Sequence, residues 1–183
     1  MNTADKHDPL KDYKKDSKGK YVYSGKLYRI KLSDRDIKEL FKRYWFCIAL
    51  LFVMWIIKGL LPFRGVVYAL YCVIPFCLEL ICILMFFRGT ITFSSNKKEM
   101  KERQHRKSIE NFAVYGVVML ISLAASIITS TIYVLINGFA GDQLYFILYI
   151  VVTILMSSVT SYFNTINNKL EFNIINASDK INE

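Results

Sequence analysis

Two charged side chains, Glu79 and Lys58, lie inside segments that are otherwise apolar. Glu79 interrupts the run "LYCVIPFCLELICILMFF" over residues 70–87, and Lys58 lies near the end of the apolar run that begins at Trp45. A carboxylate among apolar groups is costly unless it is protonated or paired, so such residues often mark proton- or ion-binding sites. Glu79, with Pro75 and Lys58, is therefore the candidate substrate- or proton-binding site.

Pro75 and Glu79 are predicted to share one face of a helix, because four residues turn the helix by about 400°. Pro75 cannot donate a backbone hydrogen bond to the carbonyl of Tyr71, which predicts a kink. Lys58 lies near the carboxyl-terminal end of its apolar run, so its long side chain can extend to the interface between membrane and water. A direct pair between Lys58 and Glu79 would have to bridge roughly 8 Å of depth.

Two interpretations of Glu79 stay open. It binds a proton or cation in a small transporter, or it is a buried acid whose hydrogen bonds hold the helices in register.

No spacing in the chain predicts a catalytic site or a metal site. The four cysteines form no C-x-x-C pair and are typical of small buried apolar residues, and the two histidines lie in basic segments without other ligands nearby. No nucleophile–base pair or phosphate-binding loop is present. We therefore expect no enzyme activity, no metal and no cofactor.

Four apolar segments account for a composition that is 54% hydrophobic and 15% aromatic; they are residues 45–63, 66–87, 112–136 and 144–163. A helix needs roughly 20 residues to cross the hydrocarbon of a bilayer, and none of the segments alternates as a barrel strand does. The sequence predicts an all-α, four-helix transmembrane bundle. The first segment has no small-residue cleavage site, so we expect it to be retained.

Basic residues are distributed unevenly between the two ends of the predicted bundle. Of the 24 Lys and Arg residues, 22 lie before the first segment, between the second and third, or after the fourth. Basic loops stay in the cytoplasm, so we expect a multi-pass protein of the cell membrane with both termini cytoplasmic. The charge is expected to face anionic lipids of the inner leaflet and not nucleic acid.

Small polar residues recur at four-residue steps in the third and fourth segments. They are Ser122, Ser126 and Ser130, and Thr153, Ser157 and Ser161. Small residues at this spacing allow helices to approach closely, and hydroxyl groups can form hydrogen bonds across the contact. Because a short loop makes the two segments antiparallel neighbours, the two stripes are predicted to pack against each other.

The segment over residues 33–44 has helical periodicity, and Ser33 and Asp36 form a capping-box-like start. We expect an amphipathic helix at the inner membrane face, although a charged extension of the first span would carry the same residues. Contacts with lipid headgroups are expected from Lys38, Lys42, Arg43, Tyr44 and Trp45.

The remaining charged segments carry weaker signals. Residues 1–32 are expected to be partly disordered, with either a hairpin over 20–30 that places Tyr21 opposite Tyr28 or an extended tether. Residues 96–111 are predicted to extend the third helix, and no structure is predicted for the tail over residues 164–183.

These observations favour a non-enzymatic membrane protein that acts through a protein partner in the membrane or cytoplasm, or as a homo-oligomer. It would be an accessory or interaction subunit of a membrane complex, or an immunity-type protein. The alternative is a small transporter or channel subunit that uses Glu79.

Overall fold

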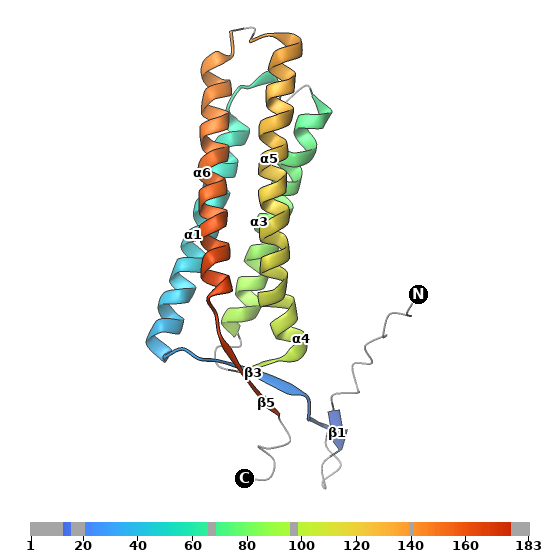
Figure 1. Cartoon of the computed structure of the whole chain (residues 1–183), viewed down its shortest axis with the longest axis vertical. Helices are drawn as coiled ribbons and strands as arrows, with labels where there is room; N and C mark the ends of the chain where they lie inside the picture. The colour runs from blue at the N-terminus through green and yellow to red at the C-terminus, as the bar shows by residue number, and fades with distance from the viewer. Residues whose placement is uncertain (1–12, 16–20, 66–68, 96–98, 140, 177–183) are drawn as a thin grey trace, which may run out of the picture.

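The four long helices that the structure describes run side by side and form a bundle (Figure 1). The computed structural model describes residues 13–15, 21–65, 69–95, 99–139 and 141–176. The helices are α1 (Asp34–Leu60), α3 (Leu70–Ser95), α5 (Asn111–Asn137) and α6 (Gln143–Asn168). The short helix α4 (Glu102–His105) and the π-helical segment η1 (Arg106–Glu110) lead into α5. Among the described residues, four helices are long and apolar enough to cross a membrane, which confirms this part of the prediction.

The core of the bundle is richest in aromatic side chains near the end where α1 begins. α1 contacts α3 and α6, and α5 contacts the same two helices. Tyr44 of α1 lies among Phe93, Phe112 and Phe163, with ring centroids 4.8–6.1 Å apart. All four side chains are fully buried. Aromatic packing therefore joins α1 to each of the other three helices.

Ser33 caps α1, and its Oγ accepts a hydrogen bond of 3.3 Å from the backbone N–H of Asp36. From there α1 continues without interruption to Leu60, so the prediction of a separate helix over 33–44 is wrong. The apolar side chains of residues 33–44 pack against aromatic side chains of α3, α5 and α6, which lie at the same height in the bundle. The buried residues of this segment are Ile37, Leu40, Phe41 and Tyr44. The prediction that Tyr44 contacts lipid headgroups is also wrong, because its ring belongs to this core.

Two glycines form the turn between α5 and α6. Gly138 and Gly141 have φ angles of 69° and 90°, values that residues with a side chain rarely adopt. Arg64, which follows α1, lies 3.6 Å from Asp142, which precedes α6. This ion pair joins the two helix connections at the end of the bundle that has few charges.

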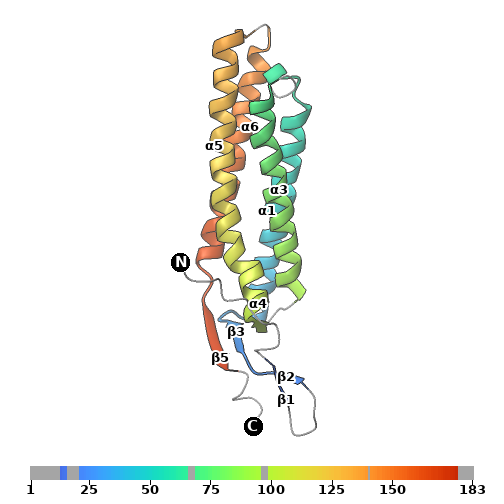
Figure 2. The ribbon, with the colours of Figure 1, turned by 90° about the vertical axis from the view of Figure 1, so that its right-hand side faces the viewer.

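A three-stranded antiparallel sheet lies at the opposite end of the bundle (Figure 2). Its central strand is β3 (Lys26–Ile30), between β4 (Glu99–Lys101) and β5 (Phe172–Asn176). Tyr28 lies opposite Met100 on one side and Ile174 on the other. The sheet therefore joins the segments that precede α1, follow α3 and follow α6.

The predicted hairpin over residues 20–30 is wrong. The strand β2 (Tyr21–Tyr23) pairs with β1 (Tyr13–Lys15), whereas β3 pairs with β4 and β5. An isolated hairpin buries little surface, whereas in the sheet the ring of Tyr28 stacks on His105 at 4.2 Å.

Two further segments differ from prediction. Residues 99–101 form β4 and not a helical extension of α5, because pairing with β3 buries Met100. The tail is ordered as far as β5, and α6 itself continues to Asn168. The predicted disorder over residues 1–12 and 16–20, and the part of the tail over 177–183, lie outside the described residues.

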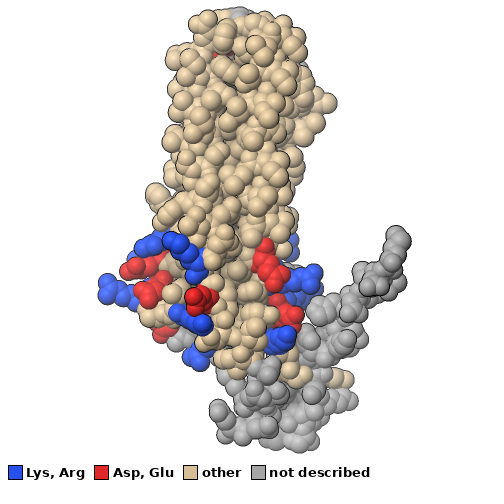
Figure 3. All heavy atoms as spheres, in the orientation of Figure 1, with Lys and Arg blue, Asp and Glu red and all other residues tan. Residues whose placement is uncertain are grey.

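Charged side chains gather at the end of the bundle that carries the sheet, and the long shaft is almost free of them on the face shown (Figure 3). Lys38, Lys42 and Arg43 are exposed at this end, and Trp45 is partly exposed. Their predicted contact with lipid headgroups stays a prediction.

Candidate functional site

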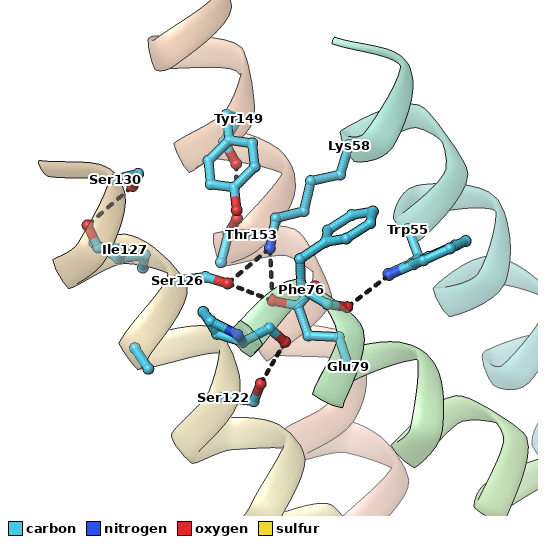
Figure 4. Close-up of polar contacts among 12 residues, drawn as sticks. Trp55, Lys58, Phe76, Glu79, Ser122, Ser126, Ile127, Ser130, Tyr149 and Thr153 are labelled. Atoms are coloured by element: carbon cyan, nitrogen blue, oxygen red, sulfur yellow. Dashed lines mark hydrogen bonds and ion pairs between the residues drawn. The ribbon is translucent and has the colours of Figure 1, made fainter. Parts of the chain in front are cut away.

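Lys58 and Glu79 form an ion pair inside the bundle (Figure 4). The ammonium Nζ of Lys58 lies 2.6 Å from Oε1 of Glu79 and donates a second hydrogen bond of 3.2 Å to Oγ of Ser126. The Ser126 hydroxyl in turn donates to Glu79 Oε1 at 2.6 Å. Both charged side chains are 0% exposed. The three groups form a closed triangle in which the buried charges neutralise each other.

All four long helices contribute to this site. Lys58 comes from α1, Glu79 from α3 and Ser126 from α5, and α6 places the ring of Tyr149 with its centroid 4.6 Å from the ammonium. A cation near an aromatic face is stabilised by the negative charge of the ring face. The site therefore links every helix of the bundle through polar or cation–π contacts.

Two backbone carbonyls next to the site are held by neighbouring helices. The Ser122 hydroxyl of α5 donates to the carbonyl of Pro75 at 2.8 Å. The Trp55 indole of α1 donates to the carbonyl of Phe76 at 3.1 Å, and the two rings stack at 4.7 Å. These bonds fix the first turns of α3, and with them the position of Glu79.

Lys58 is fully buried, whereas the sequence suggested that its side chain could extend to a membrane interface. Its side chain turns into the bundle, and its flexible stem bridges the difference in depth to Glu79. The free energy of an unpaired buried carboxylate is high, so an available cation is drawn toward it. The predicted site residues Glu79, Pro75 and Lys58 are thus brought together by the fold.

Hydroxyl groups of the two polar stripes do not bond to each other in the described hydrogen bonds, although α5 and α6 pack against each other and Ser126, Ser130 and Thr153 are buried. Ser122 and Ser126 face α3, where they donate to Pro75 and Glu79. On α6, Thr153 is buried and donates to the carbonyl of Tyr149 in its own helix, whereas Ser161 is exposed. Ser130 and Ser157 likewise donate to carbonyls of their own helices. The two α5 hydroxyls donate to the Pro75 carbonyl and the Glu79 carboxylate because these groups are stronger hydrogen-bond acceptors than another hydroxyl.

Tyr149 was not predicted to be part of the site. The signal available in the sequence was its position four residues before Thr153, on the face of the fourth segment that carries the polar stripe. Within the described residues, the Tyr149 hydroxyl and Oε2 of Glu79 are buried without a hydrogen-bond partner. The site therefore keeps some polar capacity beyond the triangle.

The part of the chain that the structure describes contains no group of three or more His, Cys, Asp or Glu side chains placed to hold a metal ion. The four cysteines are free; Cys47, Cys72 and Cys82 are buried and Cys77 is exposed.

Comparison with known proteins adds no relative: no protein-family model, curated protein or solved structure matches this chain.

Proposed function

We propose that this protein is a non-enzymatic, multi-pass membrane protein that acts as an accessory or interaction subunit, or as an immunity-type protein, by binding a protein partner. The partner is proposed to add an extended segment to the free edge of β5. In the described part of the chain, no strand pairs with this edge. The strand reads "FNIIN" and contains no Lys, Pro or acidic residue.

The edge of β5 is the observation that carries the proposal. Most proteins protect an edge strand with charges or proline, because its free N–H and C=O groups otherwise pair with another chain. The same geometry is used productively when a peptide adds a strand to a sheet. Ile174 at this strand is 60% exposed, which leaves an apolar side chain available for a partner.

The ion pair inside the bundle supports a structural role for Glu79 in this proposal. Its charge is balanced by Lys58, and both side chains are enclosed by four helices. A carrier site has to exchange its ion or proton with water on both sides, and a neutral enclosed pair has no net charge to attract a second cation.

The charge distribution supports a cell-membrane protein with the sheet and both termini in the cytoplasm. Of the 24 Lys and Arg residues, only Lys58 and Arg64 belong to the other half of the predicted topology. Basic residues near the inner boundary each gain about 1 kcal/mol from anionic lipids.

The partner proposal can be tested with a photo-crosslinking amino acid at Ile174 in native membranes. The matched control is Ile121 of α5, which is 64% exposed on the shaft of the bundle. We expect a discrete cross-linked product from position 174 that is absent from position 121. A second substitution that places proline at Ile175 should abolish the product, because proline disrupts strand pairing. Equal products at 174 and 121 would contradict the proposal.

The alternative is a small transporter or channel subunit, and it is favoured by one observation. Oε2 of Glu79 is buried without a hydrogen-bond partner among the described residues, so it has a free acceptor site. We expect purified protein in liposomes to show no more proton flux than empty liposomes, measured with an entrapped pH-sensitive dye. Flux that Glu79→Gln abolishes and Lys42→Gln leaves intact would favour the transporter.

A further inference from the structure

We infer that a hollow between α3, α4 and α5 binds the headgroup of an anionic phospholipid. The hollow has a volume of about 440 Å³ and lies at the charged end of the bundle. Its polar lining comes from Arg88, Thr92, Arg103, Gln104, Asn111 and Tyr115. This volume is in the range of small-molecule sites.

Two arginines give the hollow its positive charge. Arg88 comes from α3 and Arg103 from α4, and both side chains are exposed. In the described ranges neither guanidinium forms an ion pair, and no lining residue of the hollow is acidic. Guanidinium groups present paired N–H donors that match the oxygens of a phosphate. Two unpaired arginines around one hollow therefore favour a phosphate group as the ligand.

The local fold creates the hollow between the helices. Gly89, one of the residues that line the hollow, allows α3 to lie directly against the ring of Phe112 of α5. Beyond the hollow, the chain leaves α3, forms β4 and returns through α4 and η1. The hydrogen bonds of a π-helical turn such as η1 span one residue more than those of an α-helix, and such turns often lie at functional sites. α3 and α5 are thus in close contact at Gly89, and the polar lining residues lie beside this contact.

The surface above the hollow distinguishes a lipid from a free phosphate. Of the lining residues of α3, Met85 lies nearest to the shaft, and one turn further toward the shaft lies Ile81, which is exposed. On α5, Val118 is exposed one turn beyond Tyr115. A ligand with a phosphate in the hollow would therefore place an attached acyl chain along apolar surface. This amphiphilic arrangement is that of an anionic phospholipid at the boundary between bilayer and water.

The inference rests on the membrane placement of the bundle and not on the proposed protein partner. It can be tested by native mass spectrometry of the detergent-purified full chain, titrated with phosphatidylglycerol or with phosphatidylcholine of the same acyl chains. We expect one bound phosphatidylglycerol with at least a tenfold preference over phosphatidylcholine. Arg88→Gln/Arg103→Gln should remove this preference. The control Lys26→Gln/Lys169→Gln removes the same charge from two exposed positions, one in β3 and one directly after α6, and should change binding by less than about twofold.

Three outcomes would overturn the inference. Equal weakening by the two double variants would show a diffuse effect of charge, and equal binding of both lipids would show no anionic site. Displacement of the lipid by inorganic phosphate at equal concentration would assign the hollow to free phosphate compounds. Thermal unfolding checks that each variant is folded. If the double variant is not folded, the single variants Arg88→Gln and Arg103→Gln replace it. Each single substitution should then reduce the affinity for phosphatidylglycerol at least threefold.

Discussion

Replacing Lys58 with methionine should lower the free energy of unfolding by about 3 kcal/mol, because it leaves the carboxylate of Glu79 buried without a cation. Methionine keeps most of the apolar stem, so the loss reports the ammonium and its bonds to Glu79 and Ser126. The measurement is equilibrium unfolding in mixed micelles, followed by circular dichroism. Lys42→Met, at an exposed position of the same helix, should change the free energy by less than about 0.5 kcal/mol.

A double-mutant cycle separates the ion pair from the two side chains that form it. Glu79→Gln should also destabilise the bundle, because it leaves the ammonium of Lys58 buried without its counter-ion. The double variant Lys58→Met/Glu79→Gln removes both charges, and its Gln oxygen can still accept from Ser126. We expect the double variant to be less destabilised than the sum of the singles by at least about 1 kcal/mol. Additive losses would show that the two charges do not interact.

Gly89→Ala should destabilise the bundle by about 2 kcal/mol, because its new methyl group would overlap the ring of Phe112. The ring cannot move aside easily. It is fully buried and contacts Tyr44, Phe86 and Phe163 at centroid distances of 5.2–6.2 Å. The substitution would therefore push α3 away from α5 at the height of the aromatic core.

A compensating substitution tests whether the overlap itself is the cause. Phe112→Leu removes the ring atoms nearest to the added methyl group and alone should cost about 1 kcal/mol through lost packing. Combined with Gly89→Ala, it should cost clearly less than the sum of the two singles. Ala113→Val, which adds two carbons at an exposed position next to Phe112, is the matched control and should be nearly neutral. The idea would fail if Ala113→Val and Gly89→Ala were equally destabilising.

The four helices could be predicted because their signal is local. Each segment of about 20 apolar residues satisfies its own backbone as a helix and has the length that a bilayer requires. The cap at Ser33 could be predicted for the same reason, since it depends on neighbouring residues only.

The sheet could not be predicted, because its strands pair across the whole chain. β3 lies more than 60 residues from β4 and more than 140 from β5, and no local pattern specifies which strands meet. The alternation around Ser24 and Gly25 is compatible with a hairpin, but pairing with β4 and β5 buries more apolar surface than a hairpin could.

The candidate site was predicted in part. The sequence alone determined that Glu79, Pro75 and Lys58 are unusual, because polar groups in hydrocarbon carry a large free-energy cost wherever they lie. Only the tertiary structure decided which contacts offset that free-energy cost. The rotation of α5 about its axis turns Ser126 toward Glu79, and the packing of α1 brings Lys58 within 2.6 Å of the same carboxylate. Which residue pairs with which depends on helix rotation and on side-chain conformation, and neither is encoded in the spacing of residues along one segment.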